Sequence, residues 1–195
     1  MKVVIVKYNA GNVQSVRFAL ERLGVQAAWT DDPEEIRQAD RVIFPGVGEA
    51  SSAMEYLNAT GLSKVIAGLS QPVLGICLGL QLFCKHSEEG NTDCLNIVDV
   101  QVRKFQSVKT LKVPHIGWNT VENLQGPLFK GIEPDTRFYF VHSFYAEASP
   151  FTTASTEYGL NFSAAMQRDN FFAVQFHPEK SGPAGSLLLQ NFLSL

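Results

Sequence analysis

The first half of the chain alternates short apolar, β-branched runs with stretches of helical periodicity, and this alternation constrains the fold most. The run "VVIV" at 3–6 predicts a buried strand. Apolar residues from Val13 to Leu23 then recur at helical spacing, and Gly24 suits a helix end. Together these segments predict one βα unit.

Further units repeat the pattern. The segment "VQAAW" at 25–29 predicts a weaker strand, and Asp32 before Pro33 predicts a capped helix start. The run "RVIF" at 41–44 predicts a third strand, followed by the loop "PGVG" and a helix near 49–69. Repeated βα units predict a parallel sheet with helices on both faces.

The second half is dominated by strands and turns, such as "LNIVDVQVRKF", "RFYFVHSFYAEA" and "FFAVQF". These runs predict added strands, some of them antiparallel. The tail after "HPEKSG" predicts a terminal helix, with Ser181 as a candidate cap. We therefore expect one α/β domain over residues 1–195, with a mainly parallel sheet, helices on both faces and added antiparallel strands.

Charge and cysteine content narrow the function classes. The chain has 16 basic and 19 acidic residues, a net charge of −3, and no long charge block, so we expect neither nucleic acid nor a membrane as a partner. The apolar run near the start is too short for a signal peptide, so we expect a cytoplasmic protein. There Cys77, Cys84 and Cys94 should be thiols, and their spacing with the histidines matches no zinc pattern. We expect no metal site.

The stretch "PVLGICLGLQLF" at 72–83 places Cys77 at a predicted turn from strand to helix. Such a corner strains the residue at its tip, and only small neighbours, here Gly75 and Gly79, permit it. The pattern is that of a nucleophile elbow, in which the next N–H, that of Leu78, points at a developing oxyanion. A helix start also favours a thiolate. On this turn alone, a small buried core cysteine is an equally good interpretation.

A cysteine nucleophile needs a base and a group that orients it, and "AVQFHPEKSG" supplies both. His177 and Glu179 lie two residues apart at the exit of a predicted strand, so their side chains should point the same way. Pro178 between them stiffens the backbone. A surface histidine beside a charged turn is the alternative, and the cysteine elbow makes it the weaker one.

Together, "PVLGICLGLQLF" and "VQFHPEKSG" resemble the class I (triad) glutamine amidotransferases, over essentially the whole chain. That resemblance implies a flavodoxin-like α/β fold and a glutaminase that needs no cofactor. Cys77 would attack the glutamine carboxamide, His177 would pass a proton to the departing ammonia, and Glu179 would orient the imidazole. Water would then release glutamate from a γ-glutamyl thioester.

The resemblance also implies an oxyanion hole. Leu78 would supply one N–H, and the other would come from the "PGVG" loop around Val47. Gly46 and Gly48 give that loop freedom to rotate a peptide. Taken by itself, the loop is better interpreted as a plain turn from strand to helix.

Glutamine-binding positions follow from the same resemblance. Gln81 and Glu89 match positions that bind the amino-acid end of glutamine, and the backbone of Ser143 and Phe144 would close the pocket. A solvated loop acid remains an alternative for Glu89. For His142, in "FVHSF", a structural role near the site is favoured.

Three further segments, "PGVGEA", "PHIGWN" and "FYFVHSF", together with "YNAGN", resemble the amidotransferase subunits of imidazole glycerol phosphate synthases, which serve histidine biosynthesis. Those subunits form a heterodimer with a cyclase subunit of (β/α)₈ barrel fold. The barrel conducts ammonia to a phosphoribulosyl-formimino ribonucleotide and yields imidazole glycerol phosphate and aminoimidazole carboxamide ribotide. The candidate interface residues are Asn12, Trp118, Asn119, Tyr139 and Lys180. A core aromatic is the alternative for Trp118.

Rival functions remain open. A sister amidotransferase of pyridoxal phosphate or GMP synthesis would share the elbow and H-P-E but should lack "PHIGWN". A non-enzymatic cysteine sensor would leave His177 and Glu179 unexplained, and a cysteine peptidase would need an open cleft but no partner. Lys7 stands where many relatives carry an acidic residue, so the role of that position is open.

Overall fold

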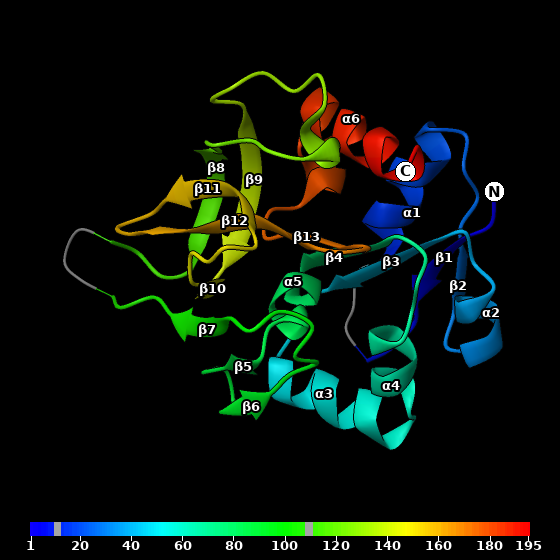
Figure 1. Ribbon diagram of the computed structural model, residues 1–195. Coiled ribbons are helices and arrows are strands. Elements are labelled where there is room, and N and C mark those ends of the chain that lie inside the picture. Colours follow the sequence, from blue (N-terminus) through cyan, green and yellow to red (C-terminus); the bar gives the residue numbers. More distant parts are fainter. Residues whose placement is uncertain (10–12, 108–110) are drawn as a thin grey trace.

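The computed structural model describes residues 1–9, 13–107 and 111–195, and a twisted sheet runs through its centre (Figure 1). The strands of this sheet are β1 (Val3–Val6), β2 (Ala28–Thr30), β3 (Arg41–Gly46), β4 (Val73–Cys77), β11 (Thr152–Glu157), β12 (Asn161–Arg168) and β13 (Phe171–Val174). Within the described residues their order is β11-β12-β13-β4-β3-β1-β2. Neighbours from β13 to β2 are parallel, whereas β12 is antiparallel to both β11 and β13. The predicted fold class is confirmed.

Helices cover both faces of this sheet. They are α1 (Val13–Arg22), α2 (Pro33–Arg37), α3 (Ala50–Ala59), α4 (Leu62–Ala67), α5 (Leu78–Phe83) and α6 (Gly182–Leu193). Figure 1 shows α1 and α6 on one side and α3, α4 and α5 on the other. Successive side chains of a strand point to opposite faces. Val4 of β1 therefore packs into the core under α3 to α5, while its neighbour Ile5 packs into the core under α1 and α6.

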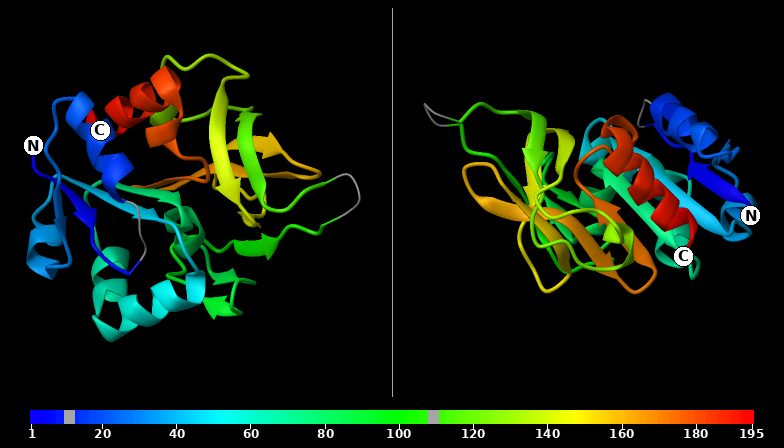
Figure 2. Two further views of the ribbon diagram at one scale, coloured as in Figure 1. Left: turned by 180° about the vertical axis from the view of Figure 1, so that it is seen from behind. Right: turned by 90° about the horizontal axis from the view of Figure 1, so that it is seen from above.

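Smaller sheets build the β-rich half of the molecule. The strands β5 (His86–Ser87), β6 (Thr92–Asp93), β7 (Gln101–Lys104) and β10 (Phe144–Ala146) form a sheet in the order β10-β7-β5-β6. An antiparallel pair joins β8 (His115–Thr120) to β9 (Arg137–His142), and the short 3₁₀ helices are η1 (Pro127–Phe129) and η2 (Pro178–Lys180). Both chain ends lie away from this half (Figure 2). Among the described residues, no helix has the length and apolar content needed to cross a membrane.

Several element boundaries differ from the predicted ones. The second strand covers 28–30 instead of 25–29, and the third continues to Gly46. The helix expected near 49–69 is interrupted at Gly61, whose φ of 74° is unfavourable inside a helix, so α3 and α4 are separate.

Of the two predicted helix caps, Asp32 and Ser181, only the first is present in the structure. The Asp32 carboxylate accepts the N–H of Glu34 at 2.8 Å, so the cap of α2 is confirmed. Ser181 precedes α6, but its hydroxyl makes no capping hydrogen bond. Instead it donates to the His177 carbonyl and accepts the Tyr139 N–H, which ties the start of α6 to the candidate site.

The turn at Cys77 is as sharp as the sequence predicted. Cys77 has φ 55° and ψ −106°, a combination that L-residues rarely adopt and that typically costs about 1–3 kcal/mol. A Cβ on Gly79 would collide with the Phe44 carbonyl oxygen, and one on Gly75 would lie 2.9 Å from the carbonyl of Gly79. The two glycines therefore let α5 pack directly on β3 and β4.

We expect Gly79→Ala to lower the free energy of unfolding by about 2 kcal/mol or more, because the added methyl group has no space beside Phe44. Urea denaturation of both proteins measures the difference. The control is Gly68→Ala at an exposed helix end, where the new Cβ would lie 3.2 Å from the Lys64 carbonyl. Equal losses at both positions would contradict the close-packing argument.

Candidate active site

Two neighbouring parallel strands bring the predicted triad together. Cys77 is the last residue of β4, and His177 and Glu179 follow β13, which pairs with β4 in parallel. The carboxyl ends of parallel neighbours meet at one edge of a sheet, where α/β proteins bind their ligands. Residues far apart in the sequence thus share one site.

His177 and Glu179 form a buried pair. The Nδ1 atom of His177 lies 2.8 Å from Glu179 Oε1, and the two side chains are only 3% and 4% exposed. A carboxylate can only accept, so Nδ1 carries the proton and Nε2 is left for the reacting side. Among the described residues Nε2 has no hydrogen-bond partner. An unpartnered buried ring nitrogen is costly unless a ligand or nucleophile uses it.

The Cys77 sulfur lies within electrostatic reach of this pair. Burial by itself lowers the pKa of His177, but the neighbouring sulfur and the Glu179 carboxylate outweigh it and raise that pKa to about 10. No hydrogen bond is completed between the sulfur and the ring in the described residues; Sγ is instead 3.8 Å from the Val141 carbonyl. Such contacts are often loose before substrate binds. The sulfur and the ring are therefore placed for proton transfer between them.

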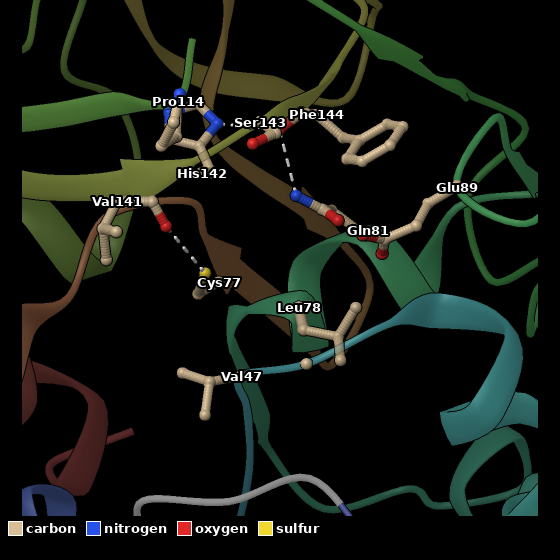
Figure 3. A pocket seen from close by; sticks show the side chains of 11 residues that line it. Val47, Cys77, Leu78, Gln81, Glu89, Pro114, Val141, His142, Ser143 and Phe144 are labelled. Carbon is tan, nitrogen blue, oxygen red and sulfur yellow. Dashed lines mark hydrogen bonds between the residues drawn. The ribbon is translucent and has the colours of Figure 1, made fainter.

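A cavity of about 310 Å³ opens beside Cys77 (Figure 3). Its volume suits a small molecule. It is lined by Val47, Gly48, Cys77, Leu78, Gln81, Glu89, Pro114, Val141, His142, Ser143 and Phe144. The predicted glutamine-binding and oxyanion residues therefore meet around one cavity, with the exception of Gly46.

Gly46 and Leu78 pack closely against each other next to Cys77. Gly46 ends β3 and pairs in register with Cys77, and a Cβ there would lie 2.9 Å from Leu78 Cβ. Leu78 is the first residue of α5, so its N–H has no acceptor within the helix. Val47 follows β3 directly, and Gly48 after it has φ 130°. An N–H without a helical acceptor, that of Leu78, thus lies next to Cys77, and Val47 and Gly48 line the same cavity.

The far end of the cavity carries free acceptors. Gln81 Nε2 donates to the Phe144 carbonyl and to Gln175 Oε1, both at 3.0 Å, so both amide protons are used and Gln81 Oε1 remains an acceptor. Glu89 Oε2 accepts the Ala50 N–H at 2.8 Å, which leaves Oε1. Burial raises the pKa of Glu89. Figure 3 shows Gln81 and Glu89 at one end of the cavity and Cys77 at the other. This polarity suits a ligand with a carbonyl near the sulfur and an ammonium group at the other end.

The sequence patterns did not predict several residues of the site. Pro114 and Val141 line the cavity without any local signal. Gln175 is fully buried, and its Nε2 lies 3.7 Å from Cys77 Sγ. Its position two residues before His177 was a usable signal, because period-2 alternation puts both on one side of the chain.

Three of the candidate interface residues, Trp118, Tyr139 and Lys180, lie close to one another. Trp118 is 48% exposed, so the core-aromatic alternative is wrong, and its ring lies 6.2 Å from that of Tyr139. Lys180 Nζ lies 5.9 Å from the Tyr139 ring. The Asn119 side chain is used internally and donates to the Glu157 carbonyl at 2.8 Å. Asn12 lies outside the described residues.

The Lys7 position also has a partner in the structure. Its ammonium lies 3.6 Å from Asp31 Oδ1, with both side chains nearly half exposed. Such a pair contributes little to stability. Nothing in it bears on the triad.

Comparison with known proteins identifies the family. The family model described as "Glutamine amidotransferase class-I" matches residues 4–195. The chain belongs to the class I glutamine amidotransferases. It is 57% identical to imidazole glycerol phosphate synthase subunit HisH of Bacteroides thetaiotaomicron, over 100% of both chains. It is 48% identical to the HisH subunit of Vibrio cholerae, over 99% of this chain and 98% of that one.

Solved structures share the fold at low identity. A glutamine amidotransferase from Thermotoga maritima matches with a TM-score of 0.66 and 17% identity, covering 100% of this chain and 83% of that one. PurLQS from the same organism matches with a TM-score of 0.71 and 16% identity, over 99% and 97%. At such identities the likeness shows the fold alone. The assignment of all 195 residues to one domain stays a prediction.

Proposed function

We propose that this chain is the glutaminase subunit of an imidazole glycerol phosphate synthase, a cytoplasmic enzyme of histidine biosynthesis. The observation that carries the chemistry is the strained Cys77 beside the buried His177–Glu179 pair, at the mouth of a cavity with acceptors at its far end. The full-length relatives at 57% and 48% identity support the pathway.

The reaction follows from the site geometry. The Cys77 thiolate attacks the carboxamide carbon of glutamine, and the N–H groups of Leu78 and Val47 stabilise the oxyanion. His177 Nε2 gives its proton to the departing ammonia, leaving a γ-glutamyl thioester on Cys77. Water then attacks the thioester while His177 takes a proton from it, and the tetrahedral intermediate expels the Cys77 thiolate as glutamate is released, which restores the thiolate and the protonated ring. Glu179 holds the ring throughout. No metal or organic cofactor takes part.

The cavity would hold the rest of glutamine. The free oxygens of Gln81 and Glu89 accept from the α-ammonium group, and the backbone of Ser143 and Phe144 closes the pocket beside them. Because both protons of Gln81 are already used, its oxygen can only accept. The cavity thereby favours a cationic amino group at this end.

The ammonia requires a sealed route to its acceptor. We propose a heterodimer with a cyclase subunit of (β/α)₈ barrel fold, docked on the surface formed by Trp118, Tyr139 and Lys180. Lys180 belongs to η2, which also holds Glu179, so this surface adjoins the triad. Asn12 and Asn119 remain candidate contacts. The products of the partner would be imidazole glycerol phosphate and aminoimidazole carboxamide ribotide.

The experiment that tests the proposal is trapping of the thioester. The complex with the cyclase is mixed with glutamine, quenched in acid and digested for mass spectrometry. We expect one γ-glutamyl group on the peptide that carries Cys77. A γ-glutamyl adduct on Cys84 would overturn the assignment. So would glutamine hydrolysis that persists in Cys77→Ala.

Glu179→Gln should retain about 10- to 100-fold more glutaminase activity than His177→Asn, because orientation contributes less than proton transfer. The substitution removes the carboxylate that raises the pKa of His177, so that pKa should fall. Steady-state glutamate release from the complex compares the variants, and NMR titration follows the ring. Equal, complete loss in two folded variants would contradict these roles.

A further inference from the structure

A chain of buried hydrogen bonds leads from the glutamine cavity into the β8–β9 pair. The Phe144 carbonyl accepts from Gln81 Nε2 at 3.0 Å and from His142 Nδ1 at 2.7 Å, both drawn in Figure 3. His142 Nε2 lies 2.9 Å from His115 Nδ1. Asn119 Nδ2 approaches His115 Nε2 at 3.4 Å. The mechanism above uses neither histidine.

The Phe144 carbonyl at one end of this series of hydrogen bonds determines which nitrogen of each histidine ring carries a proton. A carbonyl oxygen cannot donate, so Nδ1 of His142 must carry the proton and its Nε2 must be an acceptor. His115 then has to donate from Nδ1, and its Nε2 accepts from the Asn119 amide. Each ring supplies one donor and one acceptor only when it is neutral. If His142 gained a second proton, its Nε2–H would face the Nδ1–H of His115, and that hydrogen bond would be lost.

The surroundings keep both rings neutral. Burial lowers the pKa of His142 to about 3 and that of His115 to about 4. His115 is stacked between the rings of Tyr158 and Phe140, at centroid distances of 3.9 and 4.9 Å. Aromatic packing thus holds the rings in place, and the hydrogen bonds orient them.

We propose that His115 and His142 are positioning residues for the glutamine pocket, which act by holding the Phe144 carbonyl where it locks the amide of Gln81. The locked amide presents Gln81 Oε1 to the ammonium group of the substrate. This inference rests on the proposed glutaminase function. The other Gln81 proton goes to Gln175 Oε1 at 3.0 Å, which fixes the second hydrogen of the same amide.

Two substitutions at one position separate orientation from packing. Asparagine places its amide nitrogen near the Nδ1 position, so His142→Asn can still donate to Phe144. Glutamine places its amide near Nε2, so His142→Gln keeps the reach to His115 and loses the donor to Phe144. In the complex with the cyclase, we expect His142→Gln to raise KM for glutamine about tenfold with kcat changed little. His142→Asn should stay within about threefold of the wild type.

A second substitution and a spectroscopic measurement complete the test. His115→Phe keeps the aromatic stack but removes the donor to His142, and should raise KM by an intermediate factor. In the wild-type chain, ¹⁵N NMR should show both rings as the neutral Nδ1–H tautomer down to about pH 5. This measurement needs neither activity nor a folded variant.

Three results would overturn the inference: an Nε2–H tautomer at His142, an unchanged KM in a folded His142→Gln, or equal damage from His142→Asn and His142→Gln. An inactive wild-type complex would instead refute the proposed function. The two failures are therefore distinguishable.

Discussion

Cys77→Ala is expected to reduce glutamine hydrolysis by about 10⁴-fold or more, because a triad acts as a unit and cannot form the thioester without its nucleophile. Among the three cysteines, Cys77 alone lies at the strained turn and beside His177. Glutamate release from the complex with the cyclase measures the loss. The protein should still fold, since alanine removes only a sulfur that faces the cavity.

Cys84→Ala and Cys94→Ala are the matched controls. Burial raises the pKa of Cys84 well above its usual value and that of Cys94 to about 12, so both stay thiols at neutral pH. Their sulfurs contact the carbonyls of Leu80 and Thr92 and lie off the cavity lining. We expect near wild-type hydrolysis from both variants. Loss of activity in a folded Cys84→Ala, or its survival in Cys77→Ala, would show that the nucleophile is misassigned.

The isolated chain should hydrolyse glutamine about 10²- to 10³-fold more slowly than the complex with the cyclase and its nucleotide ligand. That factor is the usual effect of one missing oxyanion donor. The donor in question is the Val47 N–H, which follows β3 and precedes Gly48. A Cβ on Gly48 would meet no atom within 4 Å, so the backbone that follows Val47 has space in which to turn. Docking can therefore bias its rotation.

Glutamate release is compared for the isolated chain, the complex, and the complex with ligand. Trp118→Ala serves as the interface control: it removes an exposed ring outside the cavity lining, so it should weaken activation by the partner without changing the slow rate of the isolated chain. Full activity in the isolated chain would contradict the switch. So would a complex that responds in the same way with and without the ligand.

Local patterns predicted much of this protein. The β-branched run at 3–6, the Asp32 cap and the glycine-flanked Cys77 each depend on neighbours a few residues away, and all three have the expected structure. The helix expected near 49–69 failed because apolar periodicity continues across Gly61, while the backbone there turns at a positive φ. Periodicity reports which face is buried and is insensitive to a single turn.

The sequence by itself predicted the chemistry proposed for Cys77, His177 and Glu179, because the elbow and H-P-E are contiguous segments whose residue types suit a nucleophile, a base and an orienting group. Only the tertiary structure decided how they meet and what supports them. Parallel pairing of β13 with β4 places His177 beside Cys77, and the antiparallel register of β8 and β9 sets His115 opposite His142. Strand register is chosen by burial of whole faces against distant elements, so no local window of sequence contains it.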